Sequence, residues 1–333
     1  MNGLYPFAPH YLRVGGRTGD TAEARGHRMH YVDEGQGAPV LMVHGNPSWS
    51  FYYRDLISQL KSSHRVIAPD HIGCGRSDKP NDDNYDYTLS SRVEDLGTLV
   101  DSLDLQDLTL VVHDWGGMIG MAWAAKHRDR IARLVVMNTA AFPFPAGKTF
   151  PRSLALARTP GIGAMLVRGA NAFSRNAVRY CVTRRPMPKA VAAGYLEPYD
   201  SWANRIAVHR FVQDIPLREN DSAYPIMKEM GDALVHLVDK PMLICWGLKD
   251  FVFDQQFLDE WVRRFPGAEL HRFEDCGHYV LEDAGEEIIP LIGQFVDAGP
   301  TSHPDGRPQT QQMDSSALAE TRTVRFLTDP TQP

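Results

Sequence analysis

Residues 108–125 read LTLVVHDWGGMIGMAWAA, and they decide the fold of the chain. An apolar run, of the kind that forms a strand buried on both faces, leads directly into Asp114. Two glycines follow Trp115, and the helix-length segment after them carries Gly120. This order of strand, sharp turn and helix is typical of a nucleophile raised at the end of a strand, with Asp114 where serine usually stands.

The glycines have a physical role in such a turn. Gly116 relieves crowding beside the raised side chain, and Gly120 lets the helix approach the strand closely. The backbone N–H of Trp115, at the N-terminus of the helix, faces a developing negative charge. Val112 departs from the pattern, because a small residue usually occupies this position. The alternative is that Asp114 merely caps an ordinary helix.

Short apolar runs alternate with amphipathic segments of helical length along most of the chain. The runs predicted as strands are residues 40–44, 65–70, 108–113, 131–138, 241–247 and 268–273. The segments predicted as helices include residues 51–60, 89–103 and 116–127. This alternation predicts an α/β fold with a mostly parallel sheet flanked by helices. Residues 11–16 and 27–34 predict an antiparallel hairpin in front of it.

The alternation stops after residue 141. Residues 142–225 are helix-like and rich in proline, have no clear strand, and are too many for a plain loop. We therefore expect a core in two parts, residues 1–141 and 226–298, and a helical lid over residues 142–225, inserted after the sixth strand. The polar, proline-rich residues 299–333 are expected to form a disordered tail.

Further polar residues stand where other predicted strands end. Residues 40–43 lead into His44-Gly45-Asn46, where a second oxyanion donor stands in folds of this kind. Asp250 follows a late strand in WGLKD, and His278 lies in the loop segment DCGHYVLED. Nucleophile, acid and histidine in this order match the chain order of such triads. Each residue alone has a structural explanation, but together they predict a catalytic triad.

Four motifs, HGNPSW, HDWGG, WGLKD and GHYVLED, resemble those of the haloalkane dehalogenase branch of the α/β-hydrolase superfamily. The resemblance covers about residues 10–297. It implies an α/β-hydrolase fold, with Asp114 as nucleophile, His278 as base or acid, and Asp250 orienting His278. It also implies that Asn46 and Trp115 donate hydrogen bonds to the leaving group. Epoxide hydrolases share the HDWG motif, but they do not normally carry this asparagine.

Other segments are similar to the β-lactone decarboxylases of bacterial long-chain olefin biosynthesis. They are PDHIGCGRSDKP, YTLSSRVEDL, NTAAFPFP and EPYDSWANRIAVHRFVQDIPL. The match within the predicted lid is informative, because the lid is the part that differs most between activities on this fold. The resemblance implies decarboxylation of a cis-3,4-dialkyl β-lactone to a long-chain alkene and CO2. The alternatives are a haloalkane dehalogenase, an epoxide hydrolase and a non-catalytic binding protein.

An aspartate nucleophile suits attack at saturated carbon, because its carboxylate is already ionised at neutral pH. In a dehalogenase, Asp114 would displace halide, and His278 would activate water to cleave the resulting ester. In a β-lactone decarboxylase, Asp114 would open the four-membered ring. The sequence leaves open whether Asp114 attacks the saturated ring carbon bonded to oxygen or the carbonyl carbon.

Composition excludes several other classes of protein. The chain has 35 Lys and Arg against 41 Asp and Glu, a net charge of −6, which argues against nucleic acid or anionic membrane as the main partner. It has no apolar run long enough for a membrane span and does not start like a secretory signal, so we expect a cytoplasmic protein. The four cysteines lie far apart without a CxxC motif, and no metal, disulfide framework or cofactor is predicted.

Residues 130–196 contain eleven Lys and Arg and no Asp or Glu. One interpretation is a solvated face whose long side chains lie over apolar surface. The other is a docking face for an acidic partner, for which the resemblance implies the β-lactone synthetase and other olefin-pathway enzymes. The predicted lid also carries apolar residues that would line a tunnel for a small hydrophobic substrate: Phe142, Phe144, Phe150, Leu154, Leu156, Ile162, Met165, Leu166 and Phe173.

Overall fold

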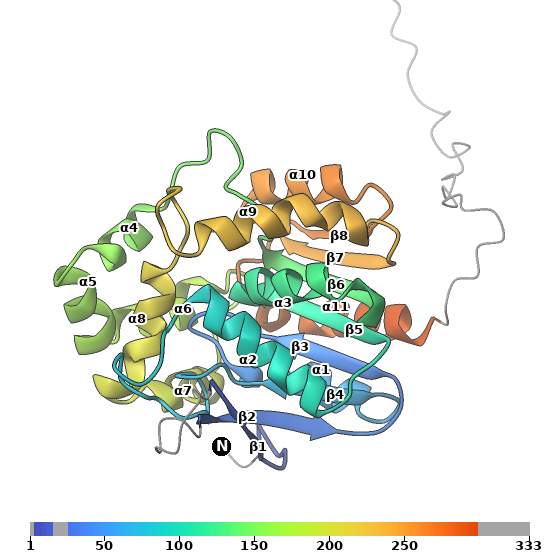
Figure 1. Cartoon of the computed structure of the whole chain (residues 1–333), viewed down its shortest axis with the longest axis horizontal. Helices are drawn as coiled ribbons and strands as arrows, with labels where there is room; N and C mark the ends of the chain where they lie inside the picture. The colour runs from blue at the N-terminus through green and yellow to red at the C-terminus, as the bar shows by residue number, and fades with distance from the viewer. Residues whose placement is uncertain (1–2, 16–25, 299–333) are drawn as a thin grey trace, which may run out of the picture. The chain divides into compact units, whose positions relative to one another are not determined.

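An eight-stranded sheet forms the centre of the computed structural model, which describes residues 3–15 and 26–298 (Figure 1). The strands are β1 (His10–Val14), β2 (His27–Glu34), β3 (Pro39–Val43), β4 (Arg65–Pro69), β5 (Leu108–Asp114), β6 (Ile131–Thr139), β7 (Met242–Gly247) and β8 (Glu269–Phe273). They lie in the order β1-β2-β4-β3-β5-β6-β7-β8. β2 pairs antiparallel with β1 and β4, whereas every pair from β4 to β8 is parallel.

The predicted α/β fold with a mostly parallel sheet is confirmed. Each of the six strands predicted from the alternating pattern forms within one residue of its expected ends, and the predicted hairpin forms from β1 and β2. The central strands were readable because they are apolar on both faces, as strands covered by helices on both sides must be.

Helices cover both faces of the sheet (Figure 1). The described α-helices are α1 (Arg54–Leu60), α2 (Leu89–Ser102), α3 (Trp115–Lys126), α4 (Arg152–Arg158), α5 (Ile162–Ala164), α6 (Ala172–Tyr180), α7 (Lys189–Leu196), α8 (Ile206–Gln213), α9 (Tyr224–Ala233), α10 (Gln255–Arg264) and α11 (Val280–Asp297). The other helical turns are the 3-10 helices η2 (Ser50–Tyr53), η3 (Arg128–Arg130), η5 (Glu197–Tyr199), η6 (Ala203–Arg205) and η7 (Leu234–Leu237), and the π-helical η4 (Met165–Gly169).

The two faces of the sheet form separate hydrophobic clusters. Leu110 and Val112 of β5 pack in the cluster that includes α2, α3, α9 and α10, whereas Val111 packs in the cluster with α1 and α11. This division follows from the alternation of side chains along a strand.

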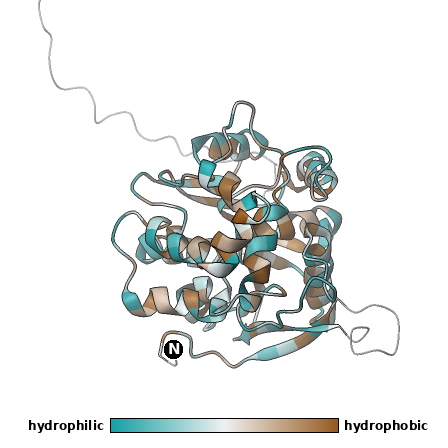
Figure 2. Cartoon of the chain, turned by 90° about the vertical axis from the view of Figure 1, so that its left-hand side faces the viewer, coloured by the Kyte–Doolittle hydropathy of each residue, from teal (hydrophilic) through white to brown (hydrophobic). Residues whose placement is uncertain are grey.

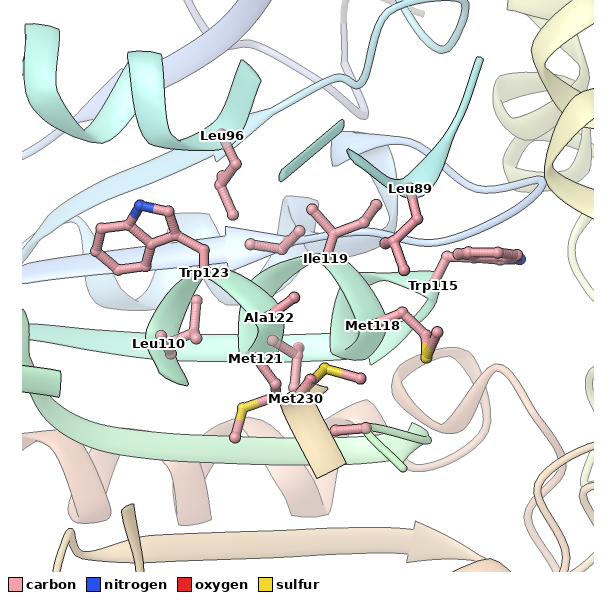
Figure 3. Packing of buried hydrophobic residues seen from close by; sticks show 14 of the residues in the cluster. Leu89, Leu96, Leu110, Trp115, Met118, Ile119, Met121, Ala122, Trp123 and Met230 are labelled. Carbon is pink, nitrogen blue, oxygen red and sulfur yellow. The ribbon is translucent and has the colours of Figure 1, made fainter. Parts of the chain in front are cut away.

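Helix α3 is the most deeply buried helix next to the sheet's centre. Residues 115–124 are all buried, as expected for a helix that is apolar on every side. Figure 3 shows Ile119 directed toward Leu89 of α2, and Met121 beside Met230 of α9. The start of α3 is therefore fixed between β5, α2 and α9, and Asp114 precedes it.

Residues 140–241, all of them described, contain helices and loops and no strand. We call α4 to α8, with η4, η5 and η6, the insertion helices. They lie to one side of the sheet, next to the carboxyl ends of β5 and β6 (Figure 1). The boundaries predicted for a lid at residues 142–225 stay a prediction, and the later boundary falls inside α9. The predicted tail, residues 299–333, lies outside the described residues.

All four cysteines are buried and none forms a disulfide. Burial raises the pKa of the Cys74 thiol to about 11 and those of Cys245 and Cys276 to about 12. Burial also raises the pKa of Cys181. The thiols therefore stay protonated at neutral pH.

Candidate active site

Asp114 stands at the turn between β5 and α3, with a φ of 53° and a ψ of −127°. Positive φ is uncommon for a residue with a side chain, and it raises Asp114 out of the strand. Two neighbouring glycines leave room for the turn: a Cβ at Gly45 would lie 2.0 Å from Asp114 Oδ1, and one at Gly116 would lie 1.9 Å from the carbonyl oxygen of Val43.

Val112, the departure from the expected motif, is accommodated by Gly120. A Cβ at Gly120 would lie 2.8 Å from Val112 Cγ1, closer than such carbon atoms approach one another. The missing side chain on the helix thus compensates for the larger side chain on the strand, and α3 still packs directly against β5.

His278 lies between two carboxylates. Its Nδ1 donates to Asp250 Oδ2 at 2.7 Å, and its Nε2 is 3.4 Å from Asp114 Oδ2. All three residues are buried. They come from the end of β5, the loop after β7 and the loop after β8, so the structure brings the predicted triad together from distant parts of the chain.

The two carboxylates determine the charge of His278. Burial disfavours the imidazolium, but the negative charge of Asp250 and the hydrogen bond to Asp114 outweigh it and raise the pKa of His278 to about 10. Burial likewise opposes ionisation of Asp114, but the hydrogen bond and charge of His278 leave the pKa of Asp114 below its ordinary value. The resting site therefore holds an ionised Asp114 beside a protonated His278.

Asp250 is fixed by neighbours that the sequence analysis did not single out. Its Oδ1 accepts from the backbone N–H groups of Val252 and Phe253 at 2.7 and 3.1 Å, and its Oδ2 accepts from Asn138 Nδ2 at 3.0 Å. Asn138 also accepts from the backbone N–H of Gly247 at 2.8 Å, which ties β6 to β7. The sequence does carry one signal for Asn138, since it is a polar residue at the end of a strand predicted to be buried.

His113, the residue before the predicted nucleophile, was also missed. Its ring stacks on Tyr52 at a centroid distance of 4.4 Å, and its Nε2 donates to the His278 carbonyl oxygen at 2.8 Å. Burial, together with the positive charge of His278, lowers the pKa of His113 to about 3, so this ring stays neutral. His113 therefore positions the backbone of His278.

Asn46 and Trp115 lie beside Asp114, and both are held by α8. The backbone N–H of Asn46 donates to Asp114 Oδ1 at 2.5 Å, and Asn46 Nδ2 donates to the Val208 carbonyl oxygen at 3.2 Å. The Trp115 ring packs on Phe211 at a centroid distance of 5.2 Å. One helix thus orients the side chains of both predicted leaving-group donors.

A cavity of about 580 Å³ extends from Asp114 and His278 to the insertion helices. Its wall includes Asn46 and Trp115 and seven of the nine apolar residues proposed from the sequence for a substrate tunnel: Phe142, Phe144, Phe150, Leu154, Leu156, Leu166 and Phe173. Ile162 and Met165, the other two, are 52% and 66% exposed. A mostly apolar cavity with a few polar groups at one end suits a small hydrophobic substrate.

The tyrosines of the insertion helices do not form a ring-opening pair of the epoxide hydrolase kind. The Tyr195 hydroxyl donates to Glu282 Oε1 at 2.6 Å, and the Tyr199 hydroxyl donates to the Ser48 carbonyl oxygen at 3.1 Å. Of the three tyrosines in this region, Tyr180 borders the cavity.

Residues 3–15 and 26–298 contain no group of three or more His, Cys, Asp or Glu side chains placed to hold a metal ion. In the same part of the chain, no helix combines the length and apolar character needed to cross a membrane.

Residues 38–285 match the family model described as the alpha/beta hydrolase fold, and the chain belongs to this family. A cis-3-alkyl-4-alkyloxetan-2-one decarboxylase of Shewanella oneidensis is 51% identical over 89% of this chain and 90% of its own length. A protein of the same name from Xanthomonas campestris is 47% identical over 82% of this chain and 93% of its own length.

Haloalkane dehalogenases are more distant relatives. The enzyme of Mycobacterium marinum is 36% identical over 86% of this chain and 93% of its own length. A solved haloalkane dehalogenase of Agrobacterium tumefaciens C58 superposes with a TM-score of 0.75 at 24% identity, covering 87% of this chain and 96% of that one. At that identity, the superposition shows the shared fold alone.

Proposed function

We propose that this chain converts cis-3,4-dialkyl β-lactones, the cis-3-alkyl-4-alkyloxetan-2-ones, into long-chain alkenes and CO2. The observation that carries the proposal is the 51% identity, over 89% of the chain, to a relative named as such a decarboxylase. The site supports it chemically, because an ionised carboxylate and a protonated imidazole stand at the end of a mostly apolar cavity.

In the proposed reaction, Asp114 attacks the saturated ring carbon that is bonded to the ring oxygen. A C–O bond to Asp114 forms while the bond from that carbon to the ring oxygen breaks, which leaves an alkyl ester and a free carboxylate. The carboxylate departs as CO2, its C–C electron pair forms the double bond, and the ester C–O bond breaks to restore Asp114. Atoms and electrons balance without water or an added proton.

The remaining residues have assigned tasks in this scheme. Asn46 Nδ2 has a second N–H besides the one donated to Val208, and with Trp115 it holds the leaving carboxylate. Asp250 orients His278, whose positive charge favours departure of the Asp114 carboxylate. Attack at the lactone carbonyl, which gives a mixed anhydride with Asp114, is the alternative first step with the same residues.

Haloalkane dehalogenation is the second candidate, favoured by the 36% identity to the M. marinum enzyme. Asp114 would displace halide held by Asn46 and Trp115, and His278 would remove a proton from water to hydrolyse the ester. A general base must be unprotonated to do this, whereas His278 carries a proton in the resting site. Hydrolysis therefore requires His278 to lose its proton once Asp114 has become a neutral ester, a step that the elimination does not need.

The test is gas chromatography of the purified chain incubated with a cis-dialkyl β-lactone, beside a halide-release assay with a bromoalkane. We expect alkene from the wild type and none above background from Asp114→Ala. Asp129→Ala, at a side chain that is 98% exposed, is the matched control and should keep wild-type activity. Halide release without alkene would assign the chain to the dehalogenases instead.

Two finer predictions go with this function. One is a cytoplasmic location. The other is docking of an acidic partner, such as the enzyme that supplies the lactone, on the basic residues 130–196. Both are supported by the sequence and the family resemblance.

A further inference from the structure

Several apolar side chains of the cavity wall are also exposed to solvent. Leu156 of α4, Tyr180 of α6 and Phe251 of the loop after β7 are 48%, 55% and 48% exposed, and all three line the cavity. A residue that both lines a cavity and meets solvent marks its mouth. The cavity therefore opens between α4, the end of α6 and the loop after β7.

The apolar surface continues from this mouth along the neighbouring turns. Ile162 of α5 and Met165 of η4 are more than half exposed, and α4, α5 and η4 follow one another and pack together. Figure 2 shows this side of the molecule face-on, with hydrophobic and hydrophilic segments interleaved. Exposed apolar residues gathered around a cavity mouth are typical of a surface that meets another apolar phase.

The basic residues of this region fall into two groups. Some form ion pairs with acidic residues elsewhere in the chain: Arg130 with Asp101, Lys148 with Asp254, Arg158 with Asp221, Arg184 with Asp275 and Glu287, and Arg185 with Glu286. Arg152 of α4, Arg175 and Arg179 of α6 and Lys189 of α7 are exposed and form no ion pair with any described residue. Arg168 of η4 likewise has no ion pair with a described residue, but its guanidinium packs on the Trp202 ring. Three of the exposed cations without such an ion pair, Arg152, Arg175 and Arg179, are thus on the two helices that border the mouth.

We propose that this rim, made of Leu156, Ile162, Met165 and Tyr180 with Arg152, Arg175 and Arg179, binds an anionic lipid surface. Apolar side chains that enter the boundary of the acyl chains, flanked by cations that meet anionic headgroups, are how a protein lies on a bilayer. The net charge of −6 argues against such a partner, but it sums over the whole chain and hides the local excess of cations.

The lipid surface gives the cavity a source of substrate. A long-chain lactone partitions into a bilayer, and a cavity that opens onto the bilayer receives it without exposing its alkyl chains to water. This step rests on the proposed function, whereas lipid binding by the rim does not. An acidic protein on the same face would pair with the arginines but would also cover the mouth.

The experiment is co-sedimentation of the full chain, without lactone, with vesicles of phosphatidylcholine alone or mixed with phosphatidylglycerol. We expect binding to the mixed vesicles that weakens at high salt. The triple variant R152Q/R175Q/R179Q should bind on the order of a hundredfold more weakly, since each cation near an anionic surface contributes roughly fivefold. The control R13Q/K228Q/R272Q removes as much charge from exposed sites outside residues 130–196 and should bind like the wild type.

A second pair of variants tests the apolar part of the rim. I162S/M165S should weaken vesicle binding, whereas Val235→Ser, at a residue that is 64% exposed and does not line the cavity, should not. Equal binding by rim and control variants would overturn the proposal. So would failure to sediment with either vesicle, which would leave an acidic protein as the occupant of this face. Vesicle binding without lactone turnover would remove the proposed function and leave the lipid-binding rim standing.

Discussion

The proton on His278 distinguishes the two candidate reactions at the scale of single residues. Asp250 Oδ2 is 2.7 Å from one ring nitrogen and Asp114 Oδ2 is 3.4 Å from the other, so the imidazolium has a negative partner on each side. Elimination of CO2 uses the positive charge of the protonated His278 directly. Hydrolysis has to remove it before water can be activated.

Replacing His278 separates the two outcomes. In His278→Ala, we expect alkene formation to fall less than about a hundredfold, because general acid–base catalysis typically contributes between roughly 10²- and 10⁴-fold and elimination needs no activated water. With a bromoalkane, the same variant should stop after one turnover and leave an alkyl ester on Asp114. Mass spectrometry of the peptide that contains Asp114 checks this; complete loss of alkene, with a trapped ester from the lactone, would contradict the elimination scheme.

Protonation of His278 also makes the stability of the folded protein depend on pH. His278 has a pKa of about 10 in the folded protein against an ordinary value of 6.5, so its stabilising contribution is complete below pH 6.5 and is lost as the pH rises through 10. The melting temperature of the wild type should therefore fall between pH 7 and pH 10 more steeply than that of His278→Gln. Parallel slopes for the two proteins would show that His278 is neutral in the folded state.

At the scale of elements, the approach of α3 to the sheet creates the turn at Asp114. A Cβ at Gly116 would meet the Val43 carbonyl oxygen at 1.9 Å, and one at Gly117 would meet Thr139 Oγ1 at the same distance. The first of these contacts is with backbone, which cannot rotate away. The glycines after Trp115 therefore set how close α3 comes to β3 and β6.

Gly116→Ala should lower the free energy of unfolding by about 1–3 kcal/mol, as overpacking usually does. Gly293→Ala is the matched control in the interior of α11, where the nearest atom, Leu60 Cδ2, would be 4.0 Å from the new Cβ. There the substitution should raise the free energy of unfolding by about 0.5–1 kcal/mol, because alanine favours a helix interior over glycine. Urea denaturation of both variants gives the comparison, and a neutral Gly116→Ala would contradict the close approach.

At the scale of the whole molecule, the sequence predicts the sheet well and the contacts between distant segments poorly. Strands such as 108–114 are apolar on both faces, and this pattern is local. The contacts that complete the site are not local: Asn138 meets Asp250, and Asn46 meets Val208 of α8. The sequence likewise does not predict that Arg184 pairs with Asp275 whereas Arg175 pairs with no described acidic residue, because such pairs join residues far apart in the chain.

The cavity between the sheet and the insertion helices should determine which lactones are accepted. Ala172, the first residue of α6, lines this cavity and is only partly buried, so Ala172→Phe fills space without straining the core. Each methylene that loses its place costs about fourfold in binding, so blocking about three should lower kcat/KM for a long-chain lactone roughly fiftyfold. A short-chain lactone should be nearly unaffected. An equal loss for both substrates would place Ala172 outside the substrate path.

The four buried thiols make the chain directly suitable for site-specific labelling. A thiol reacts as its thiolate, and burial together with a raised pKa keeps each native cysteine inert. A single cysteine introduced in place of Met165 would be the one accessible thiol. A polarity-sensitive fluorophore attached there would brighten when the rim enters an apolar phase, and it would report the docked orientation in real time without removal of any native cysteine.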